Sequence, residues 1–339
     1  MAYWNPTDWD KMDKREIFAF LADCSARGRR AALVSLVSAT GSSMREPGAH
    51  MAVADDGSFV GSLSGGCIER AVVAEACEVI AEARARVTRF GQGSRYIDIR
   101  LPCGGGVDLH FHPLFDGALA QQALGAIDAR HPFGLELTTD QHAPRFNPNW
   151  HPTSWNAELE CATVGHWPSP RLLIAGHGDA VSKLGWHGRA WGGEIAIVTP
   201  DAVLADRLMH DGFEPRVIHS PSDTSALVSD PWTAVVFLFH DHDWEPALIA
   251  HALAQPHFYI GAMGSKRAHS ARRAALRLRD VPEAAIDGIA SPIGLFHSVR
   301  DPATLAISIL AEIADRVRTH AAFATAKPTL MNSEIRQIG

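Results

Sequence analysis

No stretch of the sequence comes near the roughly 20 apolar residues of a membrane-spanning helix. Residues 1–10 are polar and aromatic, without the apolar centre of a secretory signal. We therefore expect a cytoplasmic protein with no membrane partner. Basic residues are also in short supply, because the net charge is −7. Since binding to a phosphate backbone needs a surplus of cations, we expect no nucleic-acid partner.

Cysteine is scarce too, and no two cysteines stand in a Cys-x-x-Cys pair. The odd, dispersed set argues against a disulfide framework and against a zinc ribbon, so we expect reduced thiols. No internal repeat is visible. A chain of 339 residues with 46% hydrophobic and 20% charged residues is typical of an ordinary globular protein of about two domains. The five cysteines are Cys24, Cys67, Cys77, Cys103 and Cys161.

The most informative stretch is residues 61–69, a polar turn that contains Gly65, Gly66 and Cys67 and leads into an apolar, alanine-rich run. Two adjacent glycines permit unusual backbone conformations and let a ligand come close. A cysteine in the first turn of a helix lies near the positive end of the helix dipole, which favours a thiolate. Such a thiolate can attack an electrophile or bind a soft metal. A buried cysteine in a tight corner explains the same spacing about equally well.

Two further loops of the first half carry candidate binding residues. Cys103 stands beside Gly104 and Gly105 at the start of an expected strand, which repeats the cysteine–glycine pattern. Residues 40–48 are rich in hydroxyl groups and glycine and include Arg45. Backbone donors and a guanidinium can hold an anion there. On its own, this last loop fits an ordinary surface turn better than a binding site.

The first half predicts a mixed α/β domain over residues 1–140. Asp13 and Glu16 have the spacing of a capping box, ahead of an apolar stripe at helical spacing, and Gly28 is a suitable stop. The Asp-Asp-Gly sequence at 55–57 predicts a hairpin turn. The expected helices are 13–28, 68–84 and 117–130. The expected strands are 31–38, 50–54, 58–60, 87–90, 96–101, 107–112 and 133–138.

Residues 139–170 show no clear periodicity and are rich in Pro, Asn, His and Trp. Because roughly 30 unstructured residues would be unusual inside a compact domain, we predict a linker at 141–170, with an irregular strand near 161–164. Strands and helices then alternate from 171 to 320, which is typical of a Rossmann-like domain with a mainly parallel sheet. Residues 321–339 are interpreted as a tail. The expected strands are 171–175, 194–198, 216–218, 233–239 and 258–261.

Ligands of such a sheet bind beside the C-terminal ends of its strands. There, Gly176, His177 and Gly178 form an incomplete dinucleotide fingerprint, because Val181 occupies the third glycine position. Residues 240–243 alternate His and Asp, which suits either a metal site or a helix cap.

The loop at residues 261–267 predicts an anion site. Gly264 supplies a turn, Ser265 can cap the following helix, and two cations follow. Backbone amides at a helix N-terminus bind phosphate well. We therefore favour phosphate binding slightly over an ordinary turn at this position.

Short blocks along nearly the whole chain resemble the xanthine dehydrogenase accessory factors, the XdhC/CoxI family. Each block is brief, but their joint order is highly specific. The blocks in the first half are Gly41-Ser42-Ser43 with Arg45, Pro47-Gly48-Ala49 with Met51, Gly65-Gly66-Cys67-Ile68-Glu69 and Cys103-Gly104-Gly105. Those in the second half are Ala175-Gly176-His177, His240-Asp241-His242, residues 259–265, Pro292-Ile293-Gly294-Leu295 and residues 306–313.

The resemblance implies a chaperone, not an enzyme, that binds molybdenum cofactor in its molybdopterin form. Such a chaperone protects the cofactor while a terminal sulfido ligand is installed, and delivers it to a molybdenum hydroxylase of the xanthine dehydrogenase type. It implies Cys67 and Cys103 as cofactor-binding residues, with Cys67 as the contact to the metal. A homodimer and a cysteine desulfurase partner are further implications. The client stays open among xanthine dehydrogenase, carbon monoxide dehydrogenase and aldehyde oxidoreductases.

The sequence departs from the family in its second half. The resemblance leads us to expect glycines at the positions of Ile174 and Asp179, an acid at Thr199 and a threonine at Phe239. These departures weigh against a conventionally bound NAD, although another nucleotide or the pterin phosphate can still be held there.

Two other functions remain as alternatives. One is an oxidoreductase that uses a nicotinamide nucleotide, with Cys67 as its redox thiol. The other is a metal-dependent hydrolase built on His240, His242 and Asp243, which we consider much weaker.

Overall fold

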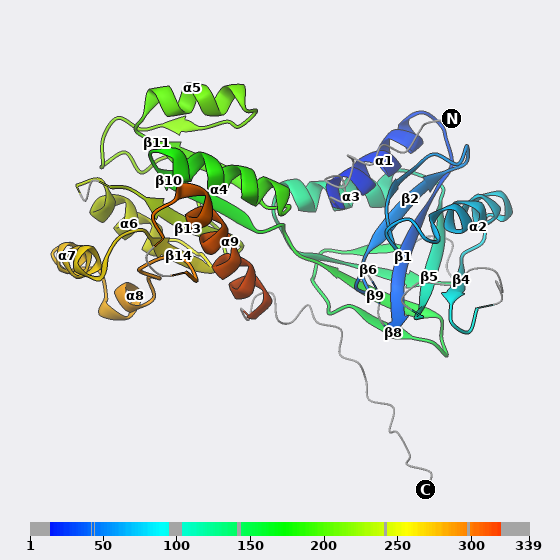
Figure 1. Cartoon of the computed structure of the whole chain (residues 1–339). Coiled ribbons are helices and arrows are strands. Elements are labelled where there is room, and N and C mark those ends of the chain that lie inside the picture. The colour runs from blue at the N-terminus through cyan, green and yellow to red at the C-terminus, as the bar shows by residue number, and fades with distance from the viewer. Residues whose placement is uncertain are drawn as a thin grey trace, which may run out of the picture. The chain divides into compact units, whose positions relative to one another are not determined.

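The computed structural model describes residues 14–41, 43, 45–94, 104–140, 144–240, 243–296 and 299–319. They divide into two compact units, which are described separately (Figure 1). Unit 1 ends at Pro168 and unit 2 begins at Ser169. Within the described ranges, no helix is long and apolar enough to cross a membrane. The expected strand at 96–101 and the expected tail at 321–339 lie outside them, as do Asp13 and Cys103.

Unit 1 is built on a five-stranded antiparallel sheet, sheet A, in the order β3-β2-β1-β5-β4. The long central strand β1 is apolar on both faces because both faces are covered. Ala32, Val34 and Leu36 belong to one core, whereas Leu33 belongs to the other. The strands are β1 (Ala31–Thr40), β2 (His50–Ala54), β3 (Phe59–Gly61), β4 (Arg86–Gly91) and β5 (Gly106–Leu114).

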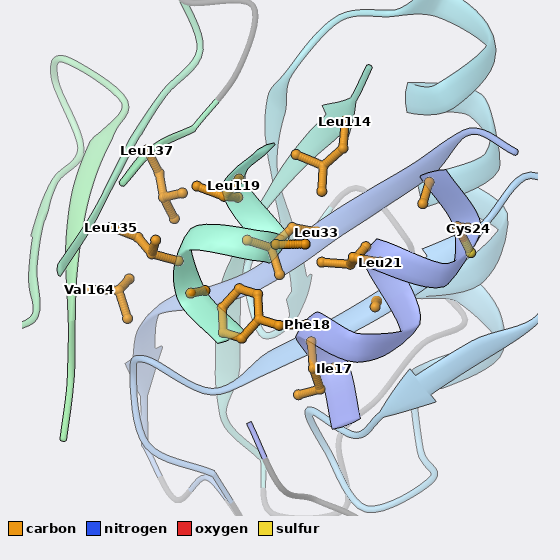
Figure 2. Close-up of a cluster of buried hydrophobic side chains, with 14 of the residues drawn as sticks. Ile17, Phe18, Leu21, Cys24, Leu33, Leu114, Leu119, Leu135, Leu137 and Val164 are labelled. Carbon is orange, nitrogen blue, oxygen red and sulfur yellow. The ribbon is translucent and has the colours of Figure 1, made fainter. Parts of the chain in front are cut away.

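Helices cover both faces of sheet A. Helix α2 (Glu69–Glu82) packs on one face, and α1 (Lys14–Ala26) and α3 (Ala118–Asp128) pack on the other. The apolar stripe expected in the first helix is confirmed. Ile17, Phe18, Leu21 and Cys24 are buried, and Figure 2 shows them pointing into one cluster with side chains of β1 and α3.

The stretch expected to be a linker at 141–170 contains three strands in its described part, so it is not unstructured, and the strand expected near 161–164 is confirmed. These three strands join β6 in a four-stranded antiparallel sheet, sheet B, in the order β7-β6-β9-β8. Leu135, Leu137 and Val164 of this sheet complete the core shared with α1 and α3 (Figure 2). Three-residue strands between Pro- and Asn-rich turns are too short for periodicity to reveal. The strands are β6 (Phe133–Thr138), β7 (Arg145–Asn147), β8 (Ser154–Asn156) and β9 (Cys161–His166).

Unit 2 confirms the parallel-sheet prediction. Its five strands form sheet C in the order β12-β11-β10-β13-β14, and every pairing is parallel. The order reverses at β10, so the crevice beside the C-terminal ends of β10 and its neighbours is the usual ligand position of such a sheet. The strands are β10 (Arg171–Gly176), β11 (Glu194–Thr199), β12 (Arg216–Val217), β13 (Thr233–Leu238) and β14 (Tyr259–Ala262).

Helices alternate with the strands of unit 2, as the sequence predicts. The five-residue helix α8 is too short to carry a helical stripe, and the sequence analysis missed it. The last helix has an N-terminal cap of a common type, since the Thr304 amide donates to the Asp301 carboxylate at 2.7 Å. The helices are α4 (Asp179–Ala190), α5 (Ala202–His210), α6 (Glu245–Leu253), α7 (Lys266–Arg277), α8 (Glu283–Asp287) and α9 (Pro302–Thr319).

Candidate functional site

The glycine-rich loops of unit 1 gather at one end of sheet A. Because its strands are antiparallel, the ends of β1, β3 and β4 lie at the same edge as the beginnings of β2 and β5. The loops after β1 and before β5 touch: a Cβ on Gly41 would lie 3.1 Å from the Cα of Gly105. Gly104 is in the left-handed region at φ 69°. Two of the loops singled out in the sequence are therefore neighbours, and the loop after β3 leaves from the same edge.

The loop after β3, residues 62–68, presents the candidate thiol. Gly65 and Gly66 have φ values of 77° and 109°, which an L side chain rarely adopts. No atom lies within 4 Å of the position that a Cβ on Gly66 would take, so the space beside this glycine is open. Cys67 is exposed. It precedes α2, which begins at Glu69, so the expected position in the first helical turn is corrected by two residues.

Glu69, the last residue of the motif, organises this loop. Its Oε1 accepts hydrogen bonds from the Ser62 hydroxyl at 2.7 Å and from the amides of Leu63 at 3.2 Å and Ser64 at 2.9 Å. Its Oε2 accepts from the Ser64 hydroxyl at 2.7 Å and the Ile68 amide at 3.1 Å. Sequence reasoning quoted this glutamate only as part of a motif. An acid just after a glycine–cysteine turn was the available signal.

The Glu69 side chain is buried and nonetheless ionised. Burial alone raises the pKa of a carboxyl group, but the hydrogen bonds from Ser62 and Ser64 outweigh burial and lower the pKa of Glu69 below 4.5. Its negative charge also lies at the N-terminus of α2. The positive end of the helix dipole, which we expected to act on Cys67, is therefore already compensated by Glu69.

Arg45 is the cation of the first glycine loop. It is half-buried, and burial lowers the pKa of its guanidinium. Its main chain exchanges two hydrogen bonds with the Ser43 hydroxyl, at 2.8 and 3.3 Å. Within the described part of the chain, its guanidinium has neither a carboxylate nor a hydrogen-bond partner. A half-buried cation without an internal counter-ion is suited to an anionic ligand.

A second arginine, which the sequence analysis missed, ties the strand ends together. Arg89 on β4 contacts both carboxylate oxygens of Asp108 at 2.9 and 3.0 Å, and donates to the Thr40 hydroxyl at 2.7 Å. A Cβ on Gly106 would lie 2.6 Å from its guanidinium. Gly106 therefore lets the arginine cross β5 and hold the edge from which residues 104 and 105 project.

Four histidines are buried in the interior of unit 1, three on strands β2 and β5 of sheet A and one, His166, on strand β9 of sheet B. The Ser35 hydroxyl lies 2.8 Å from His50 Nδ1, and His50 Nε2 lies 3.2 Å from His166 Nε2. His110 and His112 stack with their ring centroids 5.0 Å apart. Burial lowers the pKa of His50 and of His110 to about 3 and that of His112 to about 4. All are neutral at physiological pH, so we interpret them as structural.

The other described cysteines are poorer ligand candidates than Cys67. Cys24 is buried in the core, and burial raises the pKa of its thiol. Cys77 is half-buried and its sulfur lies 3.9 Å from the Ala54 carbonyl oxygen, and burial raises its pKa too. Cys161 is half-buried on β9. Cys103 cannot be compared because it lies outside the described residues.

Unit 2 places its glycine pair at the C-terminal edge of sheet C. A Cβ on Gly176 would lie 2.5 Å from the Leu238 carbonyl oxygen, so only glycine fits between β10 and β13. Gly178 is the N-terminal cap of α4 at φ 83°. The His177 ring lies 5.7 Å from Phe239 and 5.6 Å from His240. The loop lies at the C-terminal ends of the strands, where parallel sheets commonly bind ligands, and its binding of a ligand stays a prediction.

The acid beside this loop, Asp201, already accepts a hydrogen bond as a helix cap. Asp201 caps α5 by accepting from the Leu204 amide at 3.0 Å. Thr199 is fully buried, and its hydroxyl accepts from the Asp201 amide at 3.1 Å. Recognition of a dinucleotide ribose needs a free acid at the end of the second strand. Thr199 has no carboxylate, and one carboxylate oxygen of Asp201 is already bound to the Leu204 amide.

The loop before α7 has the expected cap. Gly264 has a φ of 137°, and the Ser265 hydroxyl accepts from the Ala268 amide at 3.2 Å. The neighbouring cations at 266 and 267 are exposed. The site therefore combines a turn, a cap and positive charge, as the sequence indicated.

The alternating His and Asp residues give little support to a metal site. Asp241 and His242 lie outside the described residues, and among those described no group of three or more His, Cys, Asp or Glu side chains is arranged to hold a metal ion.

The chain is a two-domain protein with a candidate cysteine site. Its first unit has an antiparallel sheet and exposes a thiol on a glycine loop, and its second unit is of the Rossmann type. The model of the XdhC and CoxI family matches residues 24–91, and that of the XdhC Rossmann domain matches residues 172–313. A protein from Escherichia coli K12 named as the molybdenum cofactor insertion chaperone PaoD is 36% identical over 309 residues. The match covers 91% of this chain and 90% of that protein. The chain belongs to the XdhC and CoxI family.

Two more distant proteins are also similar. An uncharacterized E. coli K12 protein, YqeB, is 23% identical over 287 residues, which are 83% of this chain and 42% of that protein. A crystal structure from Bacillus halodurans, described as a xanthine dehydrogenase, superposes with a TM-score of 0.71 at 23% identity. It covers 91% of this chain and 97% of the other. This last likeness concerns the fold alone.

Proposed function

We propose that this chain is a molybdenum cofactor insertion chaperone and not an enzyme. The observation that carries the proposal is the exposed Cys67 in a chain similar to PaoD. The loop that presents Cys67 is held in one conformation by its hydrogen bonds to Glu69. Cysteine sulfur is a soft ligand and suits the sulfur-rich surroundings of the metal. Binding and release of the cofactor need no chemical step by the chain itself.

The described residues fit such a cargo. The sulfur of Cys67 is accessible, and the open space beside Gly66 lets a planar group approach the backbone. The half-buried Arg45 guanidinium offers a counter-charge for the cofactor phosphate. Gly104 and Gly105 line the same edge of sheet A as Gly41. We assign Cys103 to this site on the family resemblance alone.

We further propose that the cargo is carried in its sulfurated form to a xanthine dehydrogenase-type molybdenum hydroxylase. A cysteine desulfurase would supply the sulfur, and the chaperone would act as a homodimer. In unit 2, the amides at Gly178, Gly264 and Ser265 would hold a phosphate or a nucleotide.

The alternative is an oxidoreductase that uses a nicotinamide nucleotide. It requires an acid for the ribose and a second glycine step after Gly178. Asp201 already caps a helix through one of its carboxylate oxygens. Asp179 places a negative charge in the first turn of α4, where it forms an ion pair with Arg207 at 3.1 Å. Both features weigh against this alternative.

Anaerobic titration of the full chain with molybdenum cofactor, followed by gel filtration and metal analysis of the protein peak, tests the proposal. We expect stoichiometric co-elution, and transfer to an apo-hydroxylase identifies the client. Cys67→Ala should fold normally and lose most of the cofactor, whereas Cys161→Ala should retain it. Absence of co-elution, with binding of a nicotinamide nucleotide instead, would favour the oxidoreductase. Full retention by Cys67→Ala would exclude the thiol as ligand.

A further inference from the structure

We propose that Glu69 is a positioning residue for Cys67, and that its carboxylate permanently occupies the amide donors of loop 62–68. The loop then presents a thiol to the cargo and has no pocket for a phosphate. This inference rests on the proposed function and refines it, because the molybdenum and sulfur end of the cargo would face Cys67 while its phosphate lies elsewhere.

The hydrogen bonds of the loop have only one consistent direction. A carboxylate can only accept, so the Ser64 hydroxyl must donate its proton to Glu69. The Ser64 oxygen then accepts from the amides of Cys67 at 3.0 Å and Ile68 at 3.1 Å. Glu69 thus acts on the backbone of Cys67 through one intervening hydroxyl. All groups of this relay are satisfied, and Ser64 and Glu69 are both buried.

Because of the same hydrogen bonds, the loop lacks the free backbone amides that an anion-binding loop needs. The amides of Leu63 and Ser64 donate to Glu69, and that of Gly65 donates to the Ser62 hydroxyl at 3.0 Å. These amides and those of Cys67 and Ile68 therefore already donate hydrogen bonds within the protein. Among residues 63–68, only the Gly66 amide has no partner in the described part of the chain. Phosphate sites at helix N-termini use several converging amides, so one is not enough.

The charge of the loop points the same way. A phosphate placed over residues 63–68 would meet the Glu69 carboxylate at close range, and like charges repel. A neutral or soft group has no such penalty and finds Cys67 exposed beside the open space at Gly66. Arg45, whose guanidinium has no carboxylate partner among the described residues, supplies a cation for the phosphate on another loop at the same edge of sheet A. The molybdenum and sulfur end of the cargo therefore suits Cys67, whereas its phosphate suits Arg45.

Alkylation of Cys67 in the full chain tests this without any molybdenum cofactor. Iodoacetamide modification at one fixed pH is followed by mass spectrometry of the peptide that contains Cys67, with and without millimolar inorganic phosphate. For the wild type we expect no protection by phosphate. For Glu69→Gln we expect alkylation about three- to fivefold faster, because removing the charge uncovers the helix dipole beside the thiol. We also expect phosphate to slow the reaction of this variant.

Three further variants separate positioning from general damage. Ser64→Ala breaks the relay while Glu69 keeps its charge, and it should change the alkylation rate from that of the wild type. Ser64→Thr keeps the hydroxyl and should react at the wild-type rate. Glu75→Gln is the matched control. Glu75 is a buried carboxylate on the same helix, and it accepts from the Thr88 hydroxyl at 2.9 Å. This variant should be destabilised but should leave the Cys67 rate unchanged.

The proposal is overturned if phosphate protects Cys67 in the wild type, since the loop would then be an anion site. It is also overturned if Glu75→Gln accelerates alkylation as much as Glu69→Gln, or if Glu69→Gln and Ser64→Ala leave the rate unchanged. Because the cofactor is absent from these experiments, their outcome does not depend on whether the chain carries it.

Discussion

Acidification should destabilise unit 1 selectively, because its core contains histidines that stay neutral. An unfolded histidine takes up a proton with a pKa near 6.5, whereas His50 and His110 do so only near pH 3 in the folded unit, and His112 near pH 4. The unfolded state therefore binds more protons below about pH 6.5, and stability falls as the pH falls. Above about pH 7.5 the effect vanishes, because the histidines are neutral in both states.

The size of the effect follows from the distance between the pH and the ordinary pKa. At about pH 5 an unfolded histidine lies about 1.5 pKa units below its midpoint, and ~1.36 kcal/mol per unit gives ~2 kcal/mol for each. The three histidines together reach ~6 kcal/mol. A domain has only about 5–15 kcal/mol of stability, so unit 1 should be close to unfolding at that pH. His166, whose pKa also lies well below 6.5, acts in the same direction.

Hydrogen exchange measured by mass spectrometry at about pH 7.5 and about pH 5 can follow each unit in the intact chain. After correction for intrinsic rates, peptides of β1 and β5 should lose protection, whereas those of β10 and β13 should keep it. No described histidine of unit 2 is buried like these four. Glu69 does not interfere, because its pKa is lowered and its contribution is lost only below about pH 4.5.

His110→Phe isolates one histidine. Neither ring nitrogen of His110 has a partner of good hydrogen-bond geometry in the described part of the unit, and only a weak contact with the Glu160 backbone acts on its pKa, so the replacement forfeits little hydrogen bonding. The loss of stability between the two pH values should shrink by ~2 kcal/mol. The exposed His131→Gln should leave it unchanged. Equal loss of protection in both units, or an unchanged pH dependence in His110→Phe, would refute the assignment of the effect to buried neutral histidines.

Two further predictions concern unit 2. Gly176→Ala should destabilise it by about 1–3 kcal/mol in urea denaturation, because the new Cβ would lie 2.5 Å from a rigid carbonyl oxygen of β13. Gly185→Ala, inside α4 with ordinary contacts of 3.4 Å, should be neutral or stabilising by up to ~1 kcal/mol. Arg272 and Glu245 form an ion pair with both side chains 1% exposed, so Arg272→Met alone should cost about 3–5 kcal/mol. The double variant with Glu245→Met should recover most of that loss, and equal losses in the single and double variants would disprove the pairing argument.

The parallel sheet of unit 2 was readable from the sequence for a simple reason. Its central strands β10 and β13 are buried on both faces, so residues such as 234–238 form continuous apolar runs, and helices with clear stripes separate the strands. The helix cap at Asp301 and the glycine turn at Gly264 are local features that need no distant partner. Sheet B was missed because its short strands are held by pairing with β6, and pairing across the chain leaves no local pattern.

By itself, the sequence determined which residues carry the candidate chemistry, since a thiol beside two glycines and an arginine in a hydroxyl-rich loop are visible in one dimension. Only the tertiary structure decided what these groups can do. It brought Gly41 against Gly105, placed no described carboxylate beside Arg45, and buried four scattered histidines in the interior of unit 1. It also turned Glu69 back onto the loop before it. A hydrogen bond depends on where a folded backbone places its donors, and spacing along the chain does not contain that information.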